Sequence, residues 1–253
     1  MIRYLCFPAF LLIWEFLSRF KLINPIFFPP FTTIVTTVVD MISSGELWLH
    51  LKISLARALS GLFIASLAGV PLGILLGGYA KKLELLLELP LEVLSQLNPF
   101  LLFHIIILFM GIGEPPKVTI VAWTCLWPIT FSTMTGVSQV NPSLIKSGRA
   151  FGLRGLSLIT KIVLPASAAQ IFAGLRLGLG YSMFMLIAAE MMGASSGLGW
   201  LVLNSQENFQ LNNMYAGVLV IALAGLVLDG LVWLPLKLWP QLAPREAVNT
   251  AGD

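Results

Sequence analysis

Few side chains in this sequence could carry out chemistry, and they fall into no catalytic pattern. The sequence has two histidines, His50 and His104, and two cysteines, Cys6 and Cys125, at spacings that suit neither a metal site nor a disulfide framework. It contains no G-x-x-x-x-G-K-[ST] phosphate loop, no H-E-x-x-H motif and no plausible Ser/His/Asp set. We therefore predict that the chain has no catalytic residues, no metal site and no cofactor of its own.

Three ionisable residues stand out because they interrupt long apolar runs: Arg176, His104 and Glu190. Charges inside a membrane are costly, so each is a candidate for a solute pathway. Arg176 could attract an anion or could satisfy broken helix ends. For His104 a hydrogen bond between helices is favoured over a ligand contact, and for Glu190 packing against the glycine-rich segment that follows. Arg176 and Glu190 lie about 21 Å apart along one helix, so they can pair only if that helix breaks.

Other charged side chains have simpler expected roles. Glu15 and Arg19 are four residues apart and are expected to pair with each other. Arg57 is expected to extend to the membrane surface. Asp229 could reach a neighbouring helix, but solvation near the inner face is favoured.

The composition places these residues in a membrane protein. The chain has 253 residues, of which 57% are hydrophobic and 11% are charged, and its mean hydropathy is +0.90. An ordinary soluble protein has roughly 25% charged residues, so a soluble domain of this size is excluded. The net charge of +3 comes from scattered loop residues and not from a basic patch, so nucleic acid is not an expected partner.

Six apolar segments are long enough to cross a bilayer, which takes roughly 20 helical residues. They predict an all-α membrane protein with a single domain over 1–253 and spans at about 4–20, 53–79, 89–111, 118–137, 165–192 and 214–238. The first could instead be a signal peptide, but it has no small-residue cleavage site and carries Glu15.

Lysine and arginine positions predict the orientation, because these residues favour the cytoplasmic side. With the amino terminus inside, the inner segments hold Arg3, Lys81, Lys82, Lys146, Arg149, Arg154, Lys161, Lys237 and Arg245. The outer segments hold only Arg19, Lys21, Lys52 and Lys117. Both termini are therefore expected in the cytoplasm.

The second span carries small residues at four-residue spacing, namely Gly61, Ala65, Gly69, Gly73 and Gly77. Such a stripe lets another helix approach closely. Ordinary bundle packing is the favoured interpretation, and packing beside a moving helix is the alternative. Pro71 is expected to kink the span.

The inner loop at 138–164 holds a short predicted helix. Asn141-Pro142 favours a helix start and Gly152 a helix stop, which gives a helix over 143–151 bearing Lys146 and Arg149. A second amphipathic stretch follows, and Leu164-Pro165 opens the fifth span. A short cytoplasmic helix suits docking on a partner, although a solvated connector is equally compatible with these residues alone.

The spacing in this loop resembles the motif of permease subunits of binding-protein-dependent ABC importers. That motif is Glu-Ala-Ala, three residues, Gly, nine residues, Ile, one residue and Leu-Pro. Gly152, Ile162, Leu164 and Pro165 match, whereas Lys146-Ser147-Gly148 stands where the family has Glu-Ala-Ala. This exchange implies either a matching change on the partner or unusual coupling.

Over about 10–238 the sequence is similar to the permeases for taurine, alkanesulfonates, nitrate and bicarbonate. It is carried by the segments 48–77, 111–114, 174–180, 189–191 and 196–199. Two departures lie in the third span: Ser95-Gln96-Leu97-Asn98-Pro99 stands where that group has Arg-Pro-x-Pro-Pro, and His104 where it has proline.

The resemblance implies an inner-membrane permease with a cytoplasmic coupling helix. It implies two ATPase subunits holding ATP and Mg²⁺, a solute-binding protein outside, a second permease copy and surrounding lipid. A sulfonate, nitrate or bicarbonate-like anion is the first expected substrate, and a neutral heterocyclic vitamin precursor the second. The alternatives are a secondary transporter, which would need an ion-coupling site that scattered single charges do not offer, and a membrane scaffold.

Overall fold

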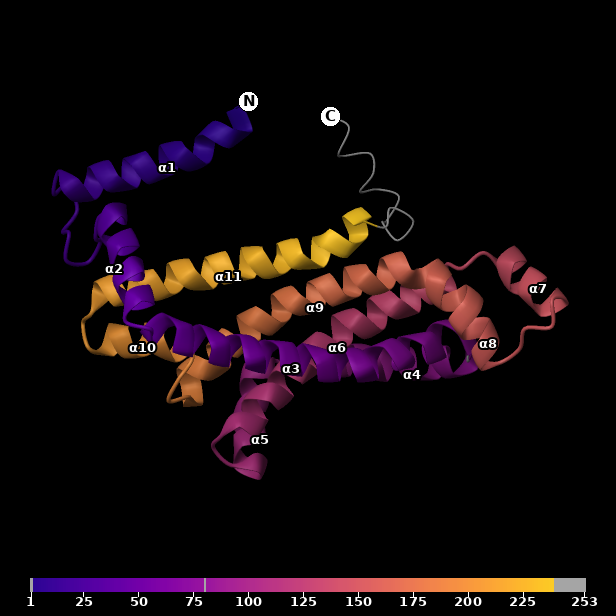
Figure 1. Ribbon diagram of the computed structural model, residues 1–253. Helices are drawn as coiled ribbons and strands as arrows, with labels where there is room; N and C mark the ends of the chain where they lie inside the picture. Colours follow the sequence, from indigo (N-terminus) through magenta and orange to yellow (C-terminus); the bar gives the residue numbers. More distant parts are fainter. Residues whose placement is uncertain (1, 80, 239–253) are drawn as a thin grey trace. The chain divides into compact units, whose positions relative to one another are not determined.

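The structure is a computed structural model that describes residues 2–79 and 81–238, and these residues form helices joined by short turns (Figure 1). The α-helices are α1 (Ile2–Arg19), α2 (Phe31–Ser43), α3 (Glu46–Ile74), α4 (Lys81–Ser95), α5 (Pro99–Met110), α6 (Glu114–Ser138), α7 (Pro142–Ala150), α8 (Leu156–Leu158), α9 (Leu164–Gly193), α10 (Leu198–Glu207) and α11 (Leu211–Leu238). Two π-helical turns, Leu75–Tyr79 and Ile159–Val163, follow α3 and α8. The all-α prediction is confirmed.

Among the described residues, four helical segments are long and apolar enough to cross a membrane: Glu46–Gly78, Glu114–Ser138, Leu156–Gly193 and Leu211–Leu231. They correspond to four of the predicted spans. The first predicted span coincides with α1, which includes three charged residues, Arg3, Glu15 and Arg19. The prediction that both termini are cytoplasmic rests partly on Arg245, which lies outside the described residues.

The third predicted span is not one straight helix. Leu89–Ser95 and Pro99–Met110 are bent by 84° relative to each other. Asn98 starts α5 anew, because its side chain accepts a hydrogen bond from the Phe100 N–H at 2.9 Å and Pro99 occupies the first turn. The prediction of a continuous span over 89–111 was therefore wrong at the segment that departs from the family pattern.

The fifth span also begins earlier than predicted. Helical structure starts at Leu156 and continues into α9, so Pro165 lies inside a continuous helical segment instead of opening it. The backbone just before Pro165 is π-helical, which is a common adjustment near a residue that has no N–H to donate. The inner loop between α6 and the fifth span is correspondingly shorter than 138–164.

The chain divides into two compact units that share the long helices α3, α9 and α11. The first unit comprises Met1–Ala56 and Ile187–Gly225. Its core joins α2, α3, α10 and α11 through Ile34, Met41, Leu47, Leu198, Leu201, Ala216 and Val220. The loop after α1 folds back on α1, because the Trp14 indole N–H and the Ser18 hydroxyl of that helix donate to the loop carbonyls of Pro29 and Phe28. Glu15 pairs with Arg19 at 3.2 Å, as predicted.

The second unit comprises Arg57–Leu186 and Leu226–Asp253, and α6 is its central helix. Glycines of α3 lie against α6: Gly69 packs on Ile129 and Gly73 on Thr133. On another side of α6, Gly174 of α9 packs on Ser132. Small residues on both neighbours let α3 and α9 approach α6 closely, which confirms the packing role predicted for the small-residue stripe.

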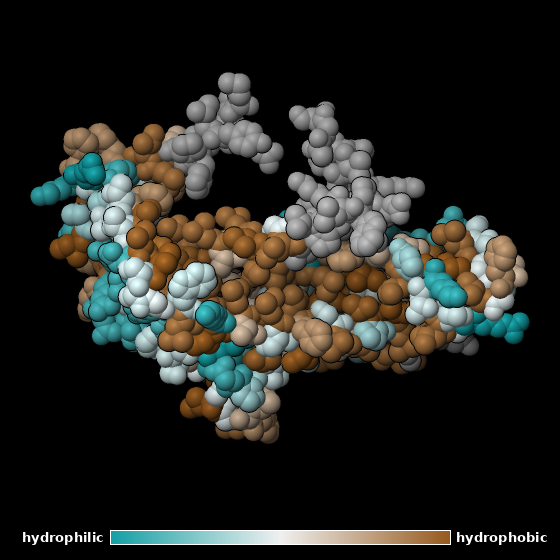
Figure 2. All heavy atoms as spheres, viewed as in Figure 1, coloured by the Kyte–Doolittle hydropathy of each residue, from teal (hydrophilic) through white to brown (hydrophobic). Residues whose placement is uncertain are grey.

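The surfaces of the long helices are largely hydrophobic (Figure 2). In the second unit, exposed apolar side chains include Phe63 and Leu67 of α3 and Leu226 of α11, whereas hydrophilic residues gather around α7. Hydrophobic surface over helices of this length is what a bilayer covers.

Candidate functional site

The short helix in the inner loop forms as predicted, within one residue at each end. Asn141 is its N-cap, because the Asn141 Oδ1 accepts a hydrogen bond from the Ser143 N–H at 2.9 Å, and Pro142 occupies the first helical position. Gly152 ends it with a left-handed φ of +80°, and the Leu153 N–H donates back to the Gly148 carbonyl at 3.0 Å. We call α7 together with Phe151 the loop helix.

Gly148 stands where the family motif has its second alanine, and it packs closely against its neighbours. It is buried, and a Cβ at this position would collide with the Cδ1 of Ile162 and come within 3.0 Å of the Leu158 side chain. An alanine, which the family motif has here, would require Ile162 to shift. Two of the positions predicted to form the motif, Gly148 and Ile162, therefore touch each other, and their contact fixes α7 on the helical segment that leads into α9.

The opposite face of the loop helix is exposed. Lys146, Ser147 and Arg149 are exposed, as are two apolar side chains, Leu144 at 50% and Phe151 at 87%. Ile145 instead packs toward the small core of Val137, Val140 and Val163. The loop helix is thus anchored on one side and presents a mixed basic and apolar surface on the other, which is suited to contact with a protein.

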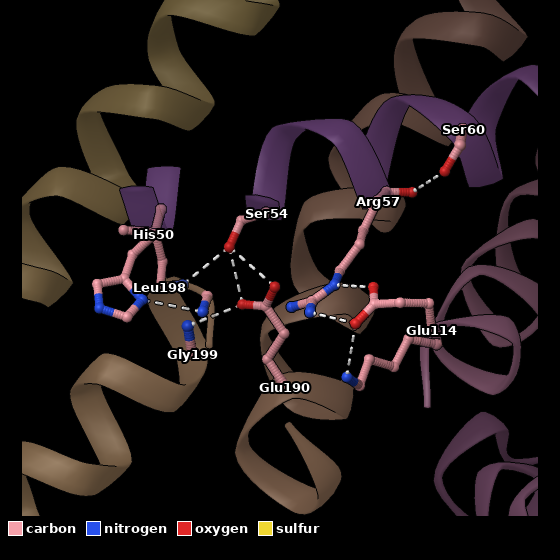
Figure 3. Close-up of polar contacts among 10 residues, drawn as sticks. His50, Ser54, Arg57, Ser60, Glu114, Glu190, Leu198 and Gly199 are labelled. Carbon is pink, nitrogen blue, oxygen red and sulfur yellow. Dashed lines mark hydrogen bonds and ion pairs between the residues drawn. The ribbon is translucent and has the colours of Figure 1, made fainter. Parts of the chain in front are cut away.

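A second constellation surrounds Glu190 in the first unit, where the side chain is fully buried (Figure 3). Its carboxylate accepts hydrogen bonds at 2.9 Å from the Ser54 hydroxyl and from the Gly199 N–H at the start of α10. The Ser54 oxygen in turn accepts from the Leu198 N–H at 2.8 Å. A carboxylate at a helix N-terminus is favoured by the helix dipole.

His50 completes this constellation. The Gly197 N–H donates to the His50 Nδ1 at 3.0 Å, so the ring proton of a neutral His50 lies on Nε2 (Figure 3). Gly197 has a φ of +121°, and a Cβ there would collide with the Glu190 carboxylate. Glu190 therefore packs against the glycine-rich segment that follows it, as predicted.

Two buried cations of the second unit share one carboxylate. Arg57 forms a two-pronged ion pair with Glu114, with Nε–Oε2 and Nη2–Oε1 distances of 2.5 and 2.6 Å. The Lys117 ammonium lies 3.3 Å from the same carboxylate, and the side chains of Arg57 and Lys117 are each 5% exposed. The expectation that Arg57 can extend to the membrane surface named no partner, and the structure gives it one, the 61% exposed Glu114 carboxylate at the start of α6.

Arg176 pairs with Asp229 across α9 and α11. The Nε and Nη2 groups of Arg176 donate to the two oxygens of Asp229 at 2.6 and 2.8 Å, and both side chains remain about 40% exposed. Solvation of Asp229 alone was the favoured prediction and was wrong, because the two residues lie at matching depths. Both are roughly ten residues from the inner ends of their predicted spans, and that signal could have revealed the pair.

His104 does not join two helices. Its Nδ1 lies 2.9 Å from the Phe100 carbonyl one turn earlier in α5, so the predicted hydrogen bond between helices was wrong for this contact. Ser54 and His50 received no predicted role, although their spacing of four residues places them on one face of α3.

Comparison with known proteins identifies the family of the chain. Residues 69–233 match the model of the binding-protein-dependent transport system inner membrane component. The chain is 32% identical over 229 residues to the aliphatic sulfonates transport permease protein SsuC of Bacillus subtilis, covering 90% of this chain and 83% of that protein. It is 29% identical to the taurine transport system permease protein TauC of Escherichia coli, covering 91% and 86%.

Solved structures show the same fold. A methionine ABC transporter, MetNI, in inward-facing conformations aligns with a TM-score of 0.62 at 18% identity, covering 71% of this chain and 91% of that one. An amino acid ABC transporter aligns with a TM-score of 0.55 at 15% identity, covering 79% and 96%. Together with the family match over most of the chain, these findings show that the protein belongs to the binding-protein-dependent transport system inner membrane components and is a permease subunit of an ABC importer.

Proposed function

We propose that this permease moves a small anion across the cytoplasmic membrane and that the loop helix receives the power stroke of a separate ATPase. The observation that carries this proposal is the contact between Gly148 and Ile162. It joins α7 to a segment continuous with α9, so a displacement of the loop helix is transmitted directly to a membrane-spanning helix. The exposed Leu144 and Phe151 supply apolar surface for the ATPase.

The family implies the other subunits of the importer. Two ATPase subunits would hold ATP and Mg²⁺ at the cytoplasmic face, and a solute-binding protein would deliver the solute from outside. Two copies of this chain would enclose the passage within the lipid, with both termini in the cytoplasm. Lys146, where the family motif has glutamate, calls for a complementary acidic group on this particular ATPase.

The solute class rests on the relatives and on charge. The relatives include permeases for sulfonates, taurine and nitrate. Arg176 provides a guanidinium at mid-membrane depth, and guanidinium groups bind sulfonate-like and carboxylate oxygens with two parallel hydrogen bonds. We therefore assign a small anion, and among the predicted pathway residues we place Arg176 on the route.

The Gly152→Asp substitution tests coupling at the loop helix. Aspartate tolerates a left-handed φ better than most residues, and a Cβ here meets nothing within 4 Å, so the fold should survive. The new charge lies at the end of the docking surface and should disturb the ATPase contact. We expect uptake in proteoliposomes containing the whole importer to fall at least tenfold, while ATP hydrolysis no longer responds to the loaded binding protein.

Gly45→Asp is the matched control. Gly45 has a φ of +82° and equally open surroundings, but it lies between α2 and α3. It should carry the same backbone strain and retain coupled uptake. Normal uptake in the Gly152→Asp importer, with the variant present in the membrane at the level of the unsubstituted chain, would refute the coupling role of the loop helix.

A further inference from the structure

An open groove of about 800 Å³ lies beside the Arg176–Asp229 pair in the second unit. Its wall is formed by Ala173, Arg176, Leu177, Gly180, Tyr181, Phe184 and Asp229. Ala173, Arg176, Gly180 and Phe184 recur every three or four residues, so they share one face of α9. Gly180 leaves the middle of this face open, since a Cβ there would meet nothing within 4 Å.

The groove combines one charged pair with an apolar aromatic wall. Tyr181 is 50% exposed and Phe184 is 63% exposed, and they follow Arg176 by five and eight residues. These spacings place them about 7.5 and 12 Å further along α9. A ligand that spans the groove would thus meet a cation at one end and aromatic rings at the other.

The exposure of the ion pair indicates that this face does not contact lipid. Arg176 lies near the middle of Leu156–Gly193, Asp229 lies toward the end of Leu211–Leu231, and the two side chains are 40% and 44% exposed. Charged groups at this depth face water-filled or protein-lined space, because contact with hydrocarbon is costly. A water-filled passage between two copies of the permease meets this requirement.

Resting on the proposed function, we propose that this groove binds an organic anion. The acid group of the solute replaces Asp229 as the partner of the Arg176 guanidinium, and its apolar tail lies against Tyr181 and Phe184. A sulfonate with a short hydrocarbon chain has the required chemistry. Nitrate and bicarbonate have no tail, so they would gain nothing from the aromatic wall.

Asp229 lowers the affinity of this groove for an anion. While the groove is empty, Asp229 neutralises Arg176, and an incoming anion must compete with it for the same Nε and Nη2 groups. A transport pathway needs a site that releases its solute, and an internal counter-ion supplies that release. Removing the charge of Asp229 should therefore tighten binding, while removing that of Arg176 should abolish it.

The test measures protection of an introduced thiol in the purified permease–ATPase complex, without the binding protein. Gly180→Cys, in a Cys6→Ser background, places a thiol in the groove, while Cys125 is buried. The rate of maleimide labelling is followed with butanesulfonate, with nitrate and with the neutral butyramide at equal concentrations. Asn212→Cys, at an exposed position outside the groove, is the control.

We expect butanesulfonate to slow labelling at position 180 and leave position 212 unaffected, and nitrate and butyramide to have no effect. Asp229→Asn should lower the half-protecting concentration by about tenfold or more, because hydrogen bonds to charged groups are worth at least that factor. Arg176→Gln should abolish protection. The double variant Arg176→Gln/Asp229→Asn remains neutral as a pair, should keep its melting temperature and should also lose protection.

Three results would overturn the proposal. Protection that persists in Arg176→Gln would exclude the guanidinium as the ligand. Equal protection by nitrate or butyramide would exclude the organic-anion class. Failure of the thiol to react without solute would show that the groove is closed to water. None of these results bears on the coupling role of the loop helix, which fails separately if the Gly152→Asp importer takes up solute normally.

Discussion

Ser54 has two simultaneous roles at the residue scale. Its hydroxyl donates to the buried Glu190 carboxylate and accepts from the Leu198 N–H, so one small side chain satisfies a charge and a helix terminus. Buried polar groups are stable only when such partners exist. Glu114 likewise has two partners, because its carboxylate pairs with both Arg57 and Lys117.

Ser54→Ala should destabilise the protein. It removes one donor from a fully buried carboxylate and leaves the Leu198 N–H without its acceptor. Each loss of this kind costs about 1–3 kcal/mol. The check is the melting temperature in detergent, which should fall clearly. Ser60→Ala is the control on the same helix, since Ser60 donates only to the Arg57 carbonyl of its own helix and its loss should cost within about 0.5 kcal/mol.

Close packing of α3 on α6 joins two long helices in the second unit. Glycines at four-residue spacing turn one face of α3 into a flat surface, and α6 lies directly on it. Helices in lipid gain little from burying apolar area, so close backbone approach provides much of their attraction. The loop helix follows the same rule on a smaller scale, because Gly148 admits Ile162.

Gly73→Ala should disrupt this fit. The added methyl group would overlap the Thr133 side chain and crowd the Thr130 carbonyl, and overpacking of this kind costs about 1–3 kcal/mol. Gly225→Ala in α11 is the matched control, because a Cβ there meets nothing within 4 Å. It should be neutral or should stabilise its helix by up to about 1 kcal/mol. Melting temperatures that shift equally for both variants would contradict the packing argument.

The distribution of lysines and arginines along the chain predicts how the protein is oriented in the membrane. Lysines and arginines concentrate in the segments predicted to be cytoplasmic: the inner loop carries Lys146, Arg149 and Arg154, and Lys161 follows in the first turns of the fifth span. This bias favours both termini inside. The loop that joins α10 to α11 is then expected outside.

Labelling from either side of sealed vesicles checks this orientation. Thiols introduced by Gln139→Cys, after α6, and by Asn212→Cys, before α11, should react with a membrane-impermeant maleimide from opposite sides. The former should react from the cytoplasmic face and the latter from the outer face. Both positions are exposed, so the substitutions should not disturb the fold. Reaction of both from one side would refute the predicted arrangement of the spans.

Much of the molecule could be predicted from local sequence. Apolar length gave the four long spans, Asn141-Pro142 and Gly152 gave the ends of the loop helix, and the spacing of Gly152, Ile162 and Leu164-Pro165 gave the family. These features depend on hydropathy, capping and backbone conformation, which neighbouring residues determine by themselves. The position of Glu190 beside a glycine-rich segment is local for the same reason.

Glu15 and Arg19 pair within one helix, but most partners of the charged residues lie far away in the sequence and were decided by tertiary structure. Arg176 and Asp229 are 53 residues apart, Arg57 and Glu114 are 57 apart, and Ser54 and Glu190 are 136 apart. An ion pair forms when two helices bring opposite charges to the same depth and face, and the sequence of either helix contains only half of that condition.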